Sequence, residues 1–74
     1  MDEKEMVLQH IHEELNDVHA YMDAYHKTKN GIFKDLAHEE MSHAMILESI
    51  YKKHGGSMDD TMHEFGEAEK ALNN

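Results

Sequence analysis

The chain has 74 residues, no cysteine and a formal net charge of −9. A chain of this length forms one domain, residues 1–74, and its core needs support from a disulfide, a metal ion or a partner subunit. The lack of cysteine excludes disulfides and thiolate metal sites, which leaves nitrogen and oxygen ligands, oligomerisation or both. The negative charge argues against binding to nucleic acid or to anionic membranes, because both require a basic surface.

The hydropathy pattern excludes a membrane span and a secretory leader. No apolar run approaches the roughly 20 residues that cross a bilayer. The acidic segment Met1 to Glu5 lacks the basic start of a signal peptide. We therefore expect a cytoplasmic protein. Its eight scattered histidines are potential nitrogen ligands or pH-sensitive groups.

The first predicted helix covers about residues 3–29 and ends at Asn30-Gly31. Spacings of three and four residues define a stripe, here called the first seam: Val7, Ile11, Glu14, Val18, Tyr21 and Tyr25. Such a stripe packs against a neighbouring helix at a shallow crossing angle. Leu8, Leu15 and Met22 flank the first seam and widen its apolar face.

The second predicted helix covers about residues 32–54 and ends before Gly55-Gly56. The residues of its stripe, the second seam, are Phe33, Leu36, Glu40, His43, Leu47, Ile50 and His54. Flanking positions of this seam are Ala37, Ala44 and Tyr51. Because only two residues separate the first two helices, we expect them to form an antiparallel hairpin.

A shorter third helix is predicted over residues 58–72, with Ser57 as its N-cap and acidic residues in its first turn. We expect it to cap the bundle or to mediate assembly through its apolar residues, which are Met58, Met62, Phe65 and Leu72. The fold is therefore predicted to be all-α. Since two helices cannot enclose a core, a hairpin from a second subunit is expected to complete a four-helix bundle.

Three polar residues, Glu14, Glu40 and His43, interrupt the two seams. A buried ionised carboxylate is costly unless it is paired, protonated or bound to a metal. Glu40 and His43 are three residues apart and therefore share one side of their helix, where both can bind one cation. Glu14 on the facing helix is a further ligand. Simple pairing of the helices places Glu14 about one turn too deep, so Asp17 is the residue that would displace or assist it.

The segments that carry these residues resemble a known family. Glu40-Met41-Ser42-His43 within "LAHEEMSHAMILESI" resembles the Glu-x-x-His element of ferritin-like di-iron proteins. In "EELNDVHAY", Glu14 precedes Tyr21 by seven residues, as in rubrerythrins and ferritin-like manganese catalases. The likeness is greatest to encapsulated ferritins, whose subunits are half-length, and it covers roughly residues 10–54. The segment between Glu14 and Glu40 is a few residues shorter than in those relatives.

The resemblance implies a homodimer, or a multiple of dimers, with a di-iron ferroxidase centre at the subunit interface. Each subunit would donate Glu14, Glu40 and His43, and Fe(II) would be oxidised with O2 or peroxide. Tyr21 would be a hydrogen-bonding or radical-quenching group beside the site. Polar residues near it would form a path for incoming ions: His10, Glu13, Asp17 and Glu39. Asp17 and His10 are also candidates for additional metal ligands. The resemblance also implies an encapsulin shell as a partner, although "KALNN" contains no addressing tail like those of that family.

Other interpretations remain open at this point. The ligand set accepts manganese or zinc as well as iron. A non-catalytic metal-binding module would hold zinc or manganese without turnover. A plain helical oligomerisation protein would use Glu14 and His43 only as a polar pair across its interface, and Glu40 with His43 could equally be a solvated surface pair.

Overall fold

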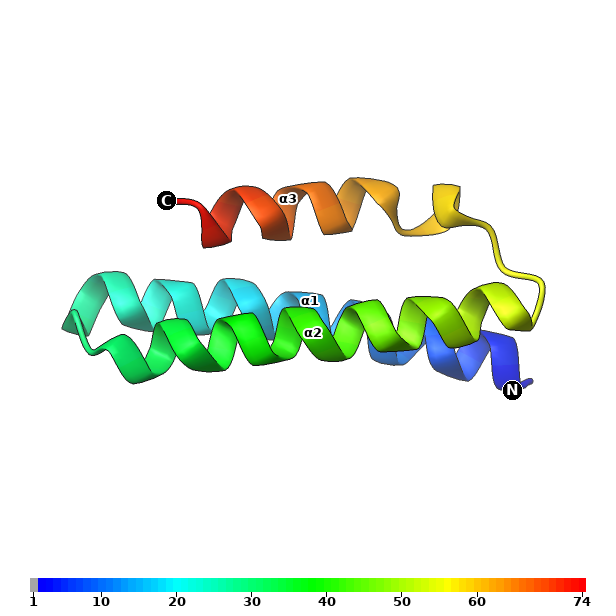
Figure 1. Cartoon of the computed structure of the whole chain (residues 1–74), viewed down its shortest axis with the longest axis horizontal. Coiled ribbons are helices and arrows are strands. Elements are labelled where there is room, and N and C mark those ends of the chain that lie inside the picture. The colour runs from blue at the N-terminus through cyan, green and yellow to red at the C-terminus, as the bar shows by residue number, and fades with distance from the viewer. Residues whose placement is uncertain (1) are drawn as a thin grey trace.

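The structure, a computed structural model, describes residues 2–74 and contains helices only within that range. Its elements in chain order are α1 (Glu3–Thr28), α2 (Gly31–Lys53), the short 3-10 helix η1 (Met58–Asp60) and α3 (Met62–Leu72). Helices α1 and α2 form an antiparallel hairpin, and α3 returns along it in the direction of α1 (Figure 1). The all-α fold and the hairpin are confirmed, and the two long helices begin and end within one residue of the predicted positions.

The hairpin turn consists of Lys29 and Asn30, one residue earlier than the predicted break. Lys29 adopts a left-handed conformation with φ 57°, and its backbone N–H donates to the Tyr25 carbonyl at 2.7 Å, which ends α1. The Asn30 side chain then accepts a hydrogen bond from the Ile32 N–H at 3.0 Å and caps α2. Each helix end is thus satisfied by a local side chain or backbone group.

The third predicted helix is divided at Thr61. Ser57 caps η1 rather than a long helix, because its hydroxyl accepts from the Asp59 N–H at 3.1 Å. Thr61 is buried, and its hydroxyl donates to Glu48 Oε2 at 2.8 Å instead of capping α3. The chain reverses its direction in the loop between α2 and η1, so that α3 lies against the hairpin (Figure 1). Gly56 lies in the loop between α2 and η1. Glycine is required at this position because a Cβ would collide with the Tyr51 ring.

The hydrophobic core lies among all three helices, and this corrects the second predicted seam. On α2 the fully buried residues are the flanking positions Ala37, Ala44 and Tyr51, whereas the second seam is half-buried or exposed. On α1 the core contains Val7, Ile11 and Val18 of the first seam, as predicted, together with the flanking Leu15 and Met22. Ala68 and Leu72 of α3 complete it. Because α3 covers one side of the hairpin, burial on α2 is centred on the side that faces α3 and not on the second seam.

Large apolar side chains remain exposed on the surface, among them Met6 near the start of α1. Ile32 and Ile46 of α2 are 62% and 61% exposed, and a second group consists of Met45, Met58 and Met62. None of the helices between residues 2 and 74 has the combination of length and apolar character that crosses a membrane.

Candidate metal centre

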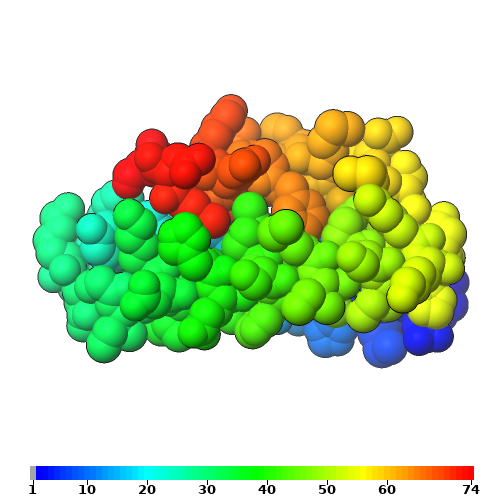
Figure 2. Space-filling view, in the orientation of Figure 1, coloured from blue at the N-terminus to red at the C-terminus, as the bar shows by residue number. Residues whose placement is uncertain are grey.

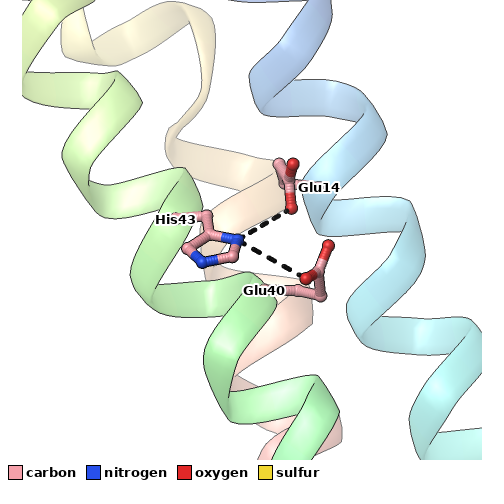
Figure 3. Close-up of side chains that lie close together, drawn as sticks. All are labelled: Glu14, Glu40 and His43. Carbon is pink, nitrogen blue, oxygen red and sulfur yellow. Dashed lines mark ion pairs between the residues drawn. The ribbon is translucent and has the colours of Figure 1, made fainter.

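Glu14 from α1 meets Glu40 and His43 from α2 in one group (Figure 3). One potential ligand atom from each residue lies within 4.8 Å of the others. The His43 Nδ1 atom is 3.7 Å from Glu14 Oε2 and 3.5 Å from Glu40 Oε1. Side chains three residues apart on a helix point to the same side, which places Glu40 beside His43. The three side chains therefore converge from two elements.

The group lies at the edge of the α1–α2 contact, on the side that α3 does not cover, here called the open face. On α1, His12 pairs with Glu64 of α3, and Glu14 is rotated from His12 by roughly 200° around the helix. In Figure 3 the third helix passes behind the group. The His43 side chain is 55% exposed, whereas those of Glu14 and Glu40 are 25% and 17% exposed. The predicted position inside the seam is therefore wrong for His43.

One oxygen of the carboxylate pair lacks a hydrogen-bond donor. Glu14 Oε2 is a buried atom without a hydrogen-bond partner among residues 2–74. The neighbouring Glu14 carboxyl raises the pKa of Glu40, through a shared hydrogen bond first and its negative charge as well, and burial acts in the same direction. His43 and Asp17 oppose that increase in the pKa of Glu40. Two close carboxylates that repel each other are stabilised by a shared proton or by a cation.

The donor set fits a divalent transition metal. Two carboxylates and one imidazole are ligands that Fe²⁺, Mn²⁺ and Zn²⁺ accept together. Magnesium and calcium prefer oxygen ligands alone, so the imidazole disfavours them. Three ligands also leave positions open for water, for an oxidant or for groups from a second subunit. Both Glu14 and Glu40 lie close enough to His43 to share one ion with it.

The remaining predicted site residues lie outside the group. Asp17 is exposed and is not part of the three-residue group, although its side chain lies close enough to Glu40 to lower the pKa of that residue. His10 is paired on its own helix with Glu13 at 3.5 Å. Tyr21 is half-buried and packs against the hydrophobic core, as a packing residue would.

A second polar cluster was not predicted from the sequence. The Tyr51 hydroxyl donates to the Asp60 carboxylate, and Thr61 donates to Glu48. The Asp60 hydrogen bond, burial and the charges of Asp60 and Glu48 raise the pKa of Tyr51 to about 12. One feature of the sequence could have indicated this cluster. Tyr51 follows Ala44 by seven residues and therefore lies on the same side of the second helix. These four residues join η1 and the start of α3 to α2.

Comparisons with known proteins do not place this chain in a family. Protein-family models, curated proteins and solved structures were each compared with it, and none matches. The likeness to encapsulated ferritins therefore rests on the two short motifs around Glu14 and Glu40. The function has to be inferred from the geometry of the site.

Proposed function

We propose that two copies of the chain associate through their open faces and form a di-iron ferroxidase centre from Glu14, Glu40 and His43 of each copy. The observation that carries this proposal is the convergence of the three side chains, with Glu14 Oε2 buried and without a donor. A bound cation would give Glu14 Oε2 the positively charged partner that it lacks. The proposed ferritin-like four-helix bundle would consist of the two α1–α2 hairpins.

Apolar residues around the group support association at the open face. They recur at spacings of three, four, seven and eleven residues from His43, which places them on its side of α2. These residues are Ile32, Leu36, Ile46, Leu47 and Ile50. Ile32 and Ile46 are largely exposed in the single chain, and a second copy would remove them from water.

The charge balance of a two-fold centre supports binding of two ferrous ions. Four carboxylates from two copies would offset the four positive charges of two Fe²⁺ ions. Each ferrous ion gives up one electron, and O2 takes both electrons with two protons to leave hydrogen peroxide. Where peroxide is the oxidant, it takes two electrons and two protons and leaves two water molecules. In the proposed centre, Glu14 and Glu40 would stabilise the added positive charge of the ferric product.

Oxygen uptake after anaerobic loading with Fe(II) tests this proposal. We expect two irons per dimer and iron-dependent O2 consumption in the wild type. Both are expected to disappear in Glu40→Ala and in His43→Ala. His38→Ala removes an exposed histidine from the same helix and serves as the matched control. Retained O2 consumption in both site variants would contradict the proposal.

A single-ion site without turnover is the second candidate function. The observation that favours it is that one chain by itself brings together three ligands. Zinc is commonly held by three protein ligands and one water, and the exposed His43 leaves room for that water. This candidate predicts one zinc or manganese ion per monomer, a higher melting temperature with metal and no O2 uptake. Metal analysis combined with sedimentation distinguishes the two candidates.

A further inference from the structure

A groove of about 460 Å³ runs between α2 and α3, along the boundary of the green and orange segments in Figure 2. Its apolar lining includes Met45 of α2, together with Met58, Met62 and Phe65 from the returning segment. Met45 is rotated from His43 by roughly 200° around α2, so the groove lies on the other side of the helix from the candidate metal centre. The proposal below does not depend on metal binding.

The methionines of the groove are exposed to an unusual degree for apolar side chains. Met45, Met58 and Met62 are 59%, 55% and 59% exposed, and they lie together along one groove. Clustered exposed apolar residues are typical of interaction surfaces. Methionine adapts to different partners, and methionine-lined grooves commonly take up the apolar face of an amphipathic helix. The groove lies between two antiparallel helices, α2 and α3, which suits a helix as its occupant.

Glu48, which also lines the groove, indicates the charge of that occupant. Its Oε2 atom accepts a hydrogen bond from Thr61, but its Oε1 atom is buried and has no partner within the described chain. Lys52 also lines the groove and does not hydrogen-bond to Oε1. A buried carboxylate oxygen without a donor is costly, and a basic side chain brought by a partner would satisfy it. Glu69 adds a second negative charge to the same groove.

Gly66 is a glycine at a position where the fold of this chain does not require one. It lies inside α3, where glycine is less favourable than alanine. A Cβ at this position would meet no atom within 4 Å, so neither packing nor backbone conformation demands glycine there. Gly66 also lines the groove, and its missing side chain gives a partner room to approach the α3 backbone.

We propose that this groove binds an amphipathic helix of another protein, whose apolar face carries a lysine or arginine that pairs with Glu48. The bound helix would fill the place of a fourth helix beside α2 and α3. Charge complementarity favours a basic partner over a second copy of this chain, which has a net charge of −9. An anionic membrane surface is disfavoured for the same reason.

Selection from a displayed library of amphipathic helices, randomised along the apolar face, tests the proposal with the full chain as bait. We expect lysine or arginine to be enriched at least fivefold at one apolar-face position. The enrichment should be lost with Glu48→Gln as bait and retained with Glu39→Gln, a matched change at an exposed position of α2. The proposal is overturned if no helix is selected, if no basic residue is enriched or if Glu48→Gln leaves the enrichment unchanged.

A second measurement uses Gly66→Ala and a selected helix. The substitution should raise the melting temperature by roughly 3 to 8 °C, because it removes a helix-interior glycine. It should also weaken binding of the selected helix at least tenfold. Gly31→Ala, at a position where a Cβ likewise has open space, should leave the affinity unchanged. Unchanged affinity in Gly66→Ala would show that the helix does not bind in this groove.

Sedimentation separates this proposal from self-association at either face. Ile46→Asp is expected to disrupt the proposed dimer at the open face, whereas Met62→Asp should leave that dimer intact. If Met62→Asp instead dissociates a dimer of the wild-type chain, the occupant of the groove is a second copy and the proposal is overturned. Loss of the dimer in Ile46→Asp with retained binding of the selected helix would support the proposal for the groove alone.

Discussion

Two half-buried glutamates of this molecule, Glu14 and Glu48, have different surroundings. Glu48 accepts a hydrogen bond from the buried Thr61 hydroxyl, and that bond joins α2 to the start of α3. Glu14 has a second carboxylate, Glu40, and an exposed imidazole, His43, as its polar neighbours in the group. Each glutamate keeps one buried oxygen without a hydrogen bond.

The difference separates a cluster that the chain's own hydroxyl groups stabilise from a candidate metal site. Around Glu48, hydroxyl groups of the chain itself donate to carboxylates, as Tyr51 also does to Asp60. These donors stabilise the junction without any ligand. Around Glu14 the neighbours are acceptors or titratable groups, so that its surroundings depend on a proton or a cation. This contrast predicts different responses to mutation. Substitutions at the junction should lower the stability of the fold, whereas substitutions at the open face should lower metal affinity.

The largest expected effect is on metal affinity. His43→Ala removes the sole nitrogen ligand of the three-residue group, and we expect zinc affinity to fall more than 100-fold, since even outer residues of metal sites cost 10- to 100-fold. Competition with a chromophoric chelator measures it. His38→Ala, an exposed histidine on the same helix, should change the affinity less than threefold. Equal losses in the two variants would identify general surface binding by histidines instead.

The junction should respond to Thr61→Val, which keeps the side-chain shape but removes the donor to Glu48. We expect the free energy of unfolding to fall by about 1 to 3 kcal/mol, because the Glu48 carboxylate then has no donor at either oxygen. Urea denaturation provides the measurement. Thr28→Val, at the exposed end of α1, should cost no more than about 0.5 kcal/mol. A neutral Thr61→Val would mean that the junction hydrogen bond does not stabilise the fold.

The pH dependence of the metal-free protein should report the carboxylate pair at the open face. The pKa of Glu40 is raised above its ordinary value of 4.5. Its contribution to stability is therefore full below about pH 4.5 and is lost as the pH rises through the folded-state pKa. As the pH rises from about 4.5 through the folded-state pKa of Glu40, the free energy of unfolding of the wild type should fall relative to that of Glu40→Gln. Urea denaturation at a series of pH values measures this difference. In a Glu14→Gln background the loss should shrink, because Glu14 is the main cause of the raised pKa.

The smallest expected effect concerns the Tyr51 hydroxyl at high pH. Its pKa is raised to about 12, so its contribution to stability is full below pH 10 and is lost as the pH rises from 10 to 12. The difference in tyrosinate absorbance between wild type and Tyr51→Phe should have its midpoint at about pH 12. Asp60→Asn should lower this midpoint, because the Asp60 carboxylate is the first cause of the shift. A wild-type midpoint near 10 would contradict the observed hydrogen bond.

The sequence predicts most of the local structure because the relevant signals are local. The helix boundaries follow from caps and breaks such as Asn30, and the pairing of Glu40 with His43 follows from their spacing along one helix. The choice between Glu14 and Asp17 could not be made in this way. It depends on how far α1 is shifted along α2, and that shift is determined by side chains packed between the helices.

The sequence by itself therefore determined the all-α class, the hairpin and the residue types that form the candidate site. Only the tertiary structure decided which side of each helix is buried. Helix α3 packs against the flank that contains Ala44 and Tyr51, and this leaves His43 at the edge of the hairpin. The physical reason is that a helical stripe specifies an apolar side but not which neighbour covers it. The covering helix sets the rotation of α1 and α2, and thereby the exposure of Glu14, Glu40 and His43.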